Sequence, residues 1–134
     1  MAITSQPIAF VVDDERNIAD TLAIILGKNG FVATPFYNPL LALSAAALGP
    51  PDLLISDVMM PELSGVDLVI RIRALCPNCR VLLFSGQADT TDFRLLARSA
   101  GGMSILAKPL HPERLLKEVW KQNPAWEAGS ARMG

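Results

Sequence analysis

Short apolar runs alternate with helix-patterned segments along the chain, and this alternation constrains the fold more than any other feature. Compact apolar runs are typical of parallel strands that are covered on both faces. The runs that we expect to form strands are residues 8–12, 31–36, 52–56, 80–85 and 103–107. Pro35 cannot donate a hydrogen bond to a sheet, so the second strand is expected to end at an edge or at a turn.

A helix is expected after each of these strands, mostly because apolar residues recur there three and four positions apart. The repeats that indicate helices are Ile18, Leu22, Ile25 and Leu26; Leu68, Ile72 and Leu75; Phe93, Leu96, Ala97 and Ala100; and Leu115, Leu116, Val119 and Trp120. The helix after the second strand is indicated by Asn38 and Pro39, an N-cap followed by a first-turn proline, and it runs to Leu48. Gly30 closes the first helix, and Pro124 stops the last one.

Strict alternation of strands and helices predicts an α/β fold, in which a parallel sheet carries helices on both faces and right-handed crossovers join the strands. The length of 134 residues suits one domain with a real core. This domain is expected over residues 1–122, with its core at about 7–122. Residues 123–134 are expected to form a flexible, loosely ordered tail.

The charge balance disfavours several classes of partner. The chain has 12 Lys and Arg residues against 13 Asp and Glu residues, and its formal net charge is −1. No broad cationic field is therefore expected to hold nucleic acid or an anionic membrane. The amino terminus lacks the pattern of a secretion signal, no apolar run approaches the length of a membrane span, and Cys76 and Cys79 are too few for a disulfide framework. These features predict a cytoplasmic protein.

Polar residues with complementary chemistry fall at or just after the predicted strand ends. They are Asp13, Asp14, Asp57, Ser85 and Lys108. In sheets of this kind, ligands bind beyond the carboxyl ends of the strands, near the point where the strand order reverses. Three acids brought together repel one another unless a cation or raised pKa values relieve the repulsion, and oxygen ligands in a small open site favour Mg²⁺.

The same residues suit the transfer of a phosphoryl group to a carboxylate. This reaction depends mostly on in-line positioning and on neutralising the charge of the equatorial oxygens. Lys108 supplies a compact cation for one phosphate oxygen, and the Ser85 hydroxyl can donate a hydrogen bond to another. Asp57 needs no general base because it is already ionised. Taken singly, an Asp at a strand end is often a cap and a Ser before Gly is often a turn residue, so the combination carries the prediction.

Four motifs together resemble those of the response-regulator receiver family. They are Asp13-Asp14-Glu15, Asp57 followed by Val58-Met59-Met60-Pro61, Ser85-Gly86 and Lys108-Pro109, in this order on matching elements. The match covers roughly residues 7–122. The resemblance implies a flavodoxin-like (βα)5 fold, a doubly wound parallel five-stranded sheet with the strand order 2-1-3-4-5.

The resemblance also implies roles for the acids and for the segment after Asp57. Asp57 is expected to be the phosphoacceptor, modified by a histidine kinase or a histidine phosphotransfer protein. Mg²⁺ is expected to be held by Asp14, Asp57 and the backbone carbonyl of Met59, with Asp13 acting through a water molecule. The chain is thus expected to be no enzyme in its own right but a phosphoacceptor that takes part in its own phosphorylation and dephosphorylation.

The resemblance further implies that Ser85 and Lys108 bind the phosphoryl group and that the Lys108–Pro109 bond is cis. Phosphorylation is expected to switch the surface of the fourth helix, fifth strand and fifth helix, and so to control binding of an unidentified downstream protein. Whether the chain also forms a homodimer stays open. Ile105 is a departure, because many receivers carry an aromatic switch residue three positions before the lysine. The coupling of phosphorylation to that surface is therefore open.

Two other functions fit the sequence less well. An aspartyl-nucleophile phosphatase of the haloacid-dehalogenase type needs a D-x-D pattern after the first strand and usually a cap insertion, whereas this chain has Asp13-Asp14-Glu15 and a compact length. A degenerate receiver that serves only as a binding scaffold is disfavoured because every acidic and basic site residue is present. The signalling switch is the remaining hypothesis.

The Cys76-Pro77-Asn78-Cys79 motif and His111 suggest other chemistry but fit it poorly. A redox C-x-x-C places its first thiol at a helix N-terminus, whereas Cys76 is expected to follow a helix. A structural zinc site needs four ligands, which the two cysteines and the sole His111 cannot supply. His111 precedes Pro112 and is expected to have a structural role where the last helix begins.

Overall fold

The computed structural model describes residues 6–86 and 104–133. Strands and helices alternate from β1 to β4, and every strand is short. The strands are β1 (Ile8–Val12), β2 (Val32–Phe36), β3 (Leu53–Asp57), β4 (Arg80–Ser85) and β5 (Ser104–Ala107). The helices are α1 (Arg16–Gly27), α2 (Pro39–Leu48), α3 (Gly65–Leu75), α5 (Pro112–Gln122) and α6 (Pro124–Met133). The helix predicted from Phe93, Leu96, Ala97 and Ala100 lies outside the described residues.

The described strands form one five-stranded parallel sheet in the order β2-β1-β3-β4-β5. This topology confirms the predicted α/β fold and its strand order. β2 lies at one edge, where Pro35 leaves no unpaired donor inside the sheet. β1 and β3 lie side by side in the register Val12 to Ser56, and β3 and β4 in the register Asp57 to Phe84. The polar residues that follow these strands therefore meet at one edge of the sheet.

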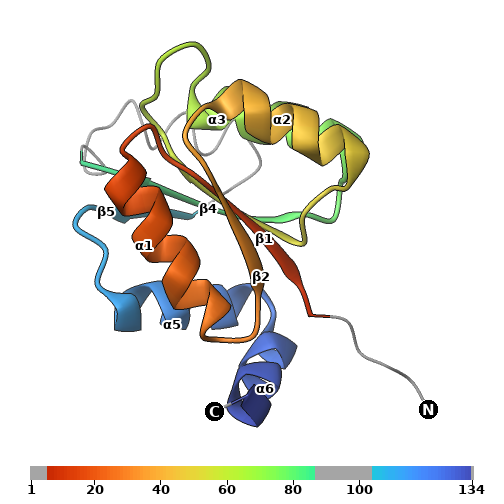
Figure 1. The fold of residues 1–134 in the computed structure, drawn as a ribbon, viewed down its shortest axis with the longest axis vertical. Coiled ribbons are helices and arrows are strands. Elements are labelled where there is room, and N and C mark those ends of the chain that lie inside the picture. The colour runs from red at the N-terminus through yellow and green to blue at the C-terminus, as the bar shows by residue number, and fades with distance from the viewer. Residues whose placement is uncertain (1–5, 87–103, 134) are drawn as a thin grey trace.

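Helices cover both faces of the sheet (Figure 1). α2 and α3 pack on one face, and α1 and α5 pack on the other. The core under α2 and α3 contains Phe10, Leu54, Leu83 and Ile72, and the core under α1 and α5 contains side chains of both helices and the opposite faces of the same strands. Because the side chains of a strand alternate between its two faces, the central strands supply both cores and carry almost no polar side chain before their last residues.

Local capping signals set the starts of two helices. The Asn38 side chain accepts a hydrogen bond from the backbone N–H of Leu40, at 2.8 Å, and Pro39 occupies the first turn of α2. The Ser64 hydroxyl accepts a hydrogen bond from the backbone N–H of Asp67, at 3.1 Å, where α3 begins. α2 therefore begins where the sequence predicted. None of the helices within the described ranges combines the length and the apolar character needed to cross a membrane.

The end of the chain differs from the expected loose tail, because residues 124–133 form the helix α6. Asn123 begins it: its side chain accepts a hydrogen bond from the backbone N–H of Ala125, at 3.1 Å. Trp126 then packs edge-on against Phe31, with ring centroids 5.2 Å apart, and Trp120 of α5 stacks on the same ring at 6.3 Å. Trp126, in the first turn after the Asn123 cap, thus packs the helix against the domain, a contact that the composition of this segment did not suggest.

Candidate functional site

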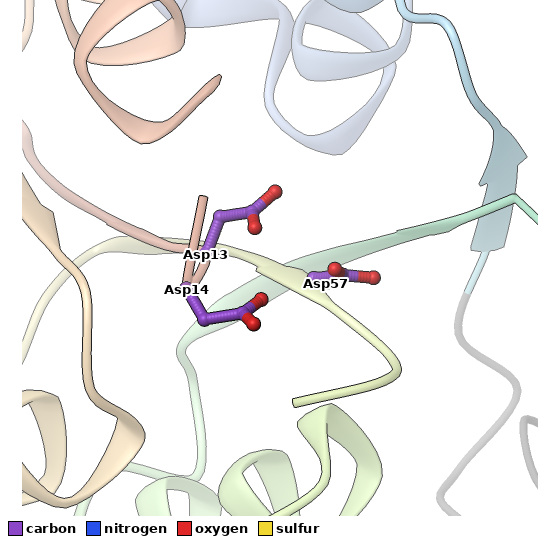
Figure 2. A group of neighbouring side chains, drawn as sticks. All are labelled: Asp13, Asp14 and Asp57. Carbon is purple, nitrogen blue, oxygen red and sulfur yellow. The ribbon is translucent and has the colours of Figure 1, made fainter. Parts of the chain in front are cut away.

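Three acidic side chains converge at the carboxyl end of the sheet (Figure 2). Asp13 and Asp14 directly follow β1, and Asp57 is the last residue of β3, the neighbouring strand. One carboxylate oxygen from each of the three lies within 4.8 Å of the others, which is close enough to share one metal ion. Asp13 and Asp57 are buried, whereas Asp14 is exposed. The structure thus brings together the acids that the sequence placed at this edge.

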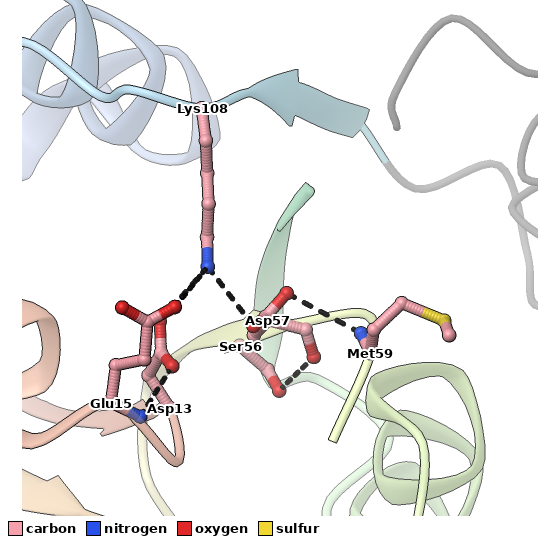
Figure 3. A network of polar contacts seen from close by, with 6 residues as sticks. All are labelled: Asp13, Glu15, Ser56, Asp57, Met59 and Lys108. Carbon is pink, nitrogen blue, oxygen red and sulfur yellow. Dashed lines mark hydrogen bonds and ion pairs between the residues drawn. The ribbon is translucent and has the colours of Figure 1, made fainter. Parts of the chain in front are cut away.

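Lys108 reaches into this acidic cluster from the segment after β5 (Figure 3). Its Nζ donates a hydrogen bond to Asp57 Oδ2 at 3.0 Å and lies 3.4 Å from Asp13 Oδ2. The backbone N–H of Lys108 donates to the carbonyl of Ser85, at 3.0 Å, and the Lys108–Pro109 peptide bond is cis, as expected. A backbone hydrogen bond to β4 therefore fixes the main chain of Lys108, while its ammonium group faces two buried carboxylates.

The surroundings of Asp13 suit a bound cation. Its Oδ2 atom is buried and accepts no hydrogen bond, although Oδ1 accepts one from the backbone N–H of Glu15 at 2.9 Å. Burial, only partly offset by that hydrogen bond and by the charge of Lys108, raises the pKa of Asp13 from 3.8 to about 6. Its ion pair with Lys108, at 3.4 Å, offsets the cost of burial only in part, and a hard divalent cation would satisfy the carboxylate further.

Lys108 remains a cation in this setting. Burial alone lowers the pKa of its ammonium group, but the hydrogen bond and charge of Asp57, followed by the charge of Asp13, outweigh burial and raise that pKa. Its charge lies 5.2 Å from the centre of the Phe84 ring, a further favourable contact. Lys108 can therefore offer a permanent positive charge to any anion bound at Asp57.

The turn between β3 and α3 fixes the backbone of Asp57. The buried Ser56 hydroxyl donates a hydrogen bond to the Asp57 carbonyl at 2.9 Å, and the backbone N–H of Met59 donates to Asp57 Oδ1 at 3.3 Å. Gly65 passes so close that an added Cβ would lie 2.1 Å from the Asp57 carbonyl oxygen. Its backbone N–H also donates to the Val58 carbonyl, at 2.9 Å. Glycine is required here because the start of α3 touches the backbone of β3.

The other predicted site residues take the following places. Ser85 is buried at the end of β4, next to β3 in the sheet. Ile105 of β5 is half-buried and packs against the core under α2 and α3. The Met59 side chain is exposed. Ser85 thus lies at the end of the strand next to Asp57. Ile105 lies one strand farther out, on β5.

A cleft of about 470 Å³ opens beside the lysine, between α1 and the segment that follows β5. Its walls include Asn17, Ile18 and Thr21 of α1, and Lys108 and Leu110 of the opposite side. The walls are largely apolar, with the lysine as their charged residue. The cleft gives a second molecule an apolar surface next to the acidic cluster.

The motifs set aside from the sequence stay outside the site. Cys76 caps the C-terminal end of α3, and burial followed by the charge of Cys76 raises the pKa of the Cys79 thiol to about 12. Such a thiol stays protonated and is a poor nucleophile. His111 is the N-cap of α5, and its side chain makes no capping hydrogen bond.

Three contributors to the site were not predicted. Glu15 was recognised only as part of a motif, yet its carboxylate lies 3.8 Å from Lys108 Nζ. The roles of Ser56 and Gly65 also emerge only from the structure. A signal existed for Ser56, since a hydroxyl inside the apolar run of β3 must find a partner when buried. Gly65 gave no signal of its own, because glycine is common in loops.

Comparisons with known proteins agree with this geometry. A sequence profile described as the response regulator receiver domain matches residues 9–120. The transcriptional regulatory protein CreB of Escherichia coli (strain K12) is 36% identical over 110 residues, which cover 82% of this chain and 48% of CreB. The chain thus spans about half the length of the curated relatives it matches.

Solved structures share the fold. The chemotaxis protein CheY4 of Vibrio cholerae superposes with a TM-score of 0.80 at 24% identity, over 87% of this chain and 98% of CheY4. A DrrB receiver domain activated by BeF3 superposes with a TM-score of 0.78 at 26% identity, over 87% of this chain and 97% of that domain. The topology, the acidic edge and the matched profile lead to one conclusion: the chain belongs to the response regulator receiver domain family of two-component signalling.

Proposed function

We propose that this receiver domain is a Mg²⁺-dependent phosphoacceptor in which Asp57 accepts the phosphoryl group. The observation that carries the proposal is the position of Lys108 Nζ, 3.0 Å from Asp57 and 3.4 Å from Asp13, in a cluster whose buried Asp13 Oδ2 accepts no hydrogen bond. A permanent cation on one side and an incomplete set of oxygen ligands on the other are what phosphoryl transfer to a carboxylate requires.

The residues present fit a magnesium ion. Asp14 and Asp57 would hold it together with the Met59 carbonyl, and Asp13 would act through a water molecule. All three carboxylates offer an oxygen within 4.8 Å of the others, and Mg²⁺ prefers oxygen ligands of this kind. When bound, the ion neutralises the carboxylates and the developing charge on the phosphoryl oxygens.

In the proposed step, an oxygen of the ionised Asp57 carboxylate attacks the phosphorus of a phosphohistidine, and the phosphorus–nitrogen bond breaks. The electron pair of that bond returns to the imidazole. Lys108 and the Ser85 hydroxyl each bind a phosphoryl oxygen. No residue removes a proton from the nucleophile, because a carboxylate has none to lose. The chain's own part is to position Asp57 and to balance charge, so it acts on itself and is no enzyme toward external substrates.

The proposed donor is a histidine kinase or a histidine phosphotransfer protein. The apolar cleft beside Lys108 supports a protein donor, since a protein could cover it next to the lysine that is hydrogen-bonded to the phosphoacceptor. The proposed output is a change in the surface around β5 and α5, read by a downstream protein. Ile105 is half-buried against the core and smaller than an aromatic switch residue, so we expect it to move little on phosphorylation.

The experiment that tests this function is labelling by acetyl phosphate with and without Mg²⁺, followed by intact mass or phosphorus NMR. We expect one phosphoryl group on the wild-type protein only with Mg²⁺, and none on Asp57→Asn. Asp67→Asn is the matched control, because this carboxylate lies in the first turn of α3 and is not one of the three acids of the cluster. Labelling that survives in Asp57→Asn, or that ignores Mg²⁺, would refute the proposal.

A further inference from the structure

Glu15 makes an unusual contact for a residue at the start of a helix. It is the N-cap of α1, but its side chain forms no capping hydrogen bond. The carboxylate instead points to Lys108, with Oε1 at 3.8 Å from Nζ, while the side chain stays 65% exposed. Figure 3 shows it beside Asp13, on the α1 side of the lysine. This contact joins the rim of the site to its central cation.

Lys108 therefore faces three carboxylates of different character. Asp57 and Asp13 are buried, at 3.0 Å and 3.4 Å from Nζ, whereas Glu15 is the outermost and is solvated. Three negative charges around one positive charge leave none of them fully paired. Phosphoryl transfer asks the lysine to turn its charge to the incoming phosphoryl oxygens, so each carboxylate competes with that group for the lysine.

Resting on the function proposed above, we propose that Glu15 is a positioning residue that restrains phosphorylation of Asp57 by drawing Lys108 toward the rim of the site. Asp13 and Asp57 are both needed in the proposed reaction, Asp13 for the metal ion and Asp57 as phosphoacceptor and metal ligand. Glu15 has neither role, and within the described residues its carboxylate pairs with Lys108 alone. It also adds a negative charge at the mouth through which an anionic phosphodonor must enter.

The expected size of the effect follows from exposure. A solvated ion pair is weak, so removing the Glu15 charge should leave folding almost unchanged. A dianionic donor roughly 7 Å from this carboxylate, in a medium close to water, should react about threefold to fivefold faster once the charge is gone. Salt screens such a contribution, and at about 1 M ionic strength the acceleration should nearly vanish.

The test compares Glu15→Gln, Glu15→Asp and Glu127→Gln with the wild type. Labelling by acetyl phosphate is followed at saturating Mg²⁺, at about 0.01 M and about 1 M salt. Gln keeps the shape of Glu15 without its charge, and Asp keeps the charge but shortens the reach to Lys108. Glu127→Gln removes the same charge from the exposed face of α6, far from the acidic edge (Figure 1).

We expect Glu15→Gln to be labelled about threefold to fivefold faster than the wild type at low salt. Glu15→Asp should be accelerated as well, and Glu127→Gln should match the wild type. A rate for Glu15→Gln at or below the wild-type rate would overturn the proposal, and so would an acceleration that high salt leaves intact. If Glu15→Asp equals the wild type, charge alone acts and the contact with Lys108 is refuted. A wild-type protein that takes no label at all instead refutes the proposed function.

Discussion

The two ends of the sheet are built on opposite physical grounds. At the carboxyl end, Asp13 and Asp57 are buried as neighbours, and one oxygen of Asp13 accepts no hydrogen bond. At the other end, Phe31 is packed between Trp120 and Trp126, and apolar contact dominates. Buried like charges oppose folding, whereas aromatic burial favours it. The site end is therefore organised for binding, and the aromatic end contributes stability that the site end lacks.

Helix α1 connects these two ends. It begins beside the acidic cluster, where the Glu15 carbonyl accepts the first backbone hydrogen bonds of the helix. It ends next to the aromatic cluster, where the backbone N–H of Phe31 donates to the Leu26 carbonyl, at 3.2 Å. Arg16 lies over the Tyr37 ring, and the Tyr37 hydroxyl donates a hydrogen bond to Asp20. Contacts with the rest of the fold therefore hold α1 at both of its ends.

The largest expected effect is the loss of folding stability and of Asp57 labelling in Gly65→Ala, a substitution at the site end of the sheet. The new Cβ would lie 2.1 Å from the Asp57 carbonyl oxygen, so the β3–α3 turn must move. We expect the free energy of unfolding in urea to fall by about 4 kcal/mol. Labelling of Asp57 should slow by on the order of tenfold to a hundredfold, since the acceptor is displaced.

Gly27→Ala is the control for that substitution. Gly27 is the last residue of α1, and an added Cβ there meets nothing within 4 Å. Alanine favours helix over glycine, so stability should stay equal or rise by about 0.5 kcal/mol. Equal losses at Gly65 and Gly27 would show that the close approach at Asp57 is unimportant.

The second expected effect concerns the pH dependence of the Mg²⁺-free protein. The pKa of Asp13 is raised from 3.8 to about 6, so the unfolded chain loses its proton first as the pH rises. Folding stability is therefore lost between about pH 4 and pH 6, and the folded state carries the penalty above that range. Two pKa units correspond to at most about 3 kcal/mol, which we lower to about 2 kcal/mol for solvent screening near the open edge.

Asp13→Asn removes this penalty, so the Mg²⁺-free variant should be about 2 kcal/mol more stable than the wild type at pH 7 and equal to it near pH 4. Thermal or urea unfolding across this pH range measures the difference. Saturating Mg²⁺ should narrow this stability difference, because it stabilises the wild type more than the variant. If the variant is less stable than the wild type at pH 7 without Mg²⁺, the buried Asp13 carboxylate does not destabilise the fold.

The smallest expected effect comes from the aromatic end. Trp126→Ala removes the edge-on contact with Phe31 but leaves Trp120 stacked on the same ring. Because Trp126 is only partly buried, we expect a loss of about 1 to 2 kcal/mol in urea unfolding, and Trp126→Phe should restore much of it. The initial rate of Asp57 labelling should stay at the wild-type value under native conditions. A slowed rate in Trp126→Ala would mean that the two ends are coupled.

The sequence predicted the site end better than the aromatic end. Asp13, Asp14, Asp57 and Lys108 were placed together because parallel strands end at a common edge, and the structure confirms this. The helix over residues 124–133 was not predicted, since a single Trp126 gives no helical repeat. Its contact with Phe31, far away in the chain, leaves no local pattern.

By itself, the sequence determined the alternation of strands and helices, the capped start of α2 at Asn38 and the chemical types of the site residues. These follow from periodicity and local hydrogen bonding, which depend on residues a few positions apart. Only the tertiary structure decided that Lys108 meets Glu15, that Gly65 touches the Asp57 carbonyl and that α6 covers Phe31. These are contacts between separate elements, and strand register and helix packing fix their distances to fractions of an ångström that no sequence pattern encodes.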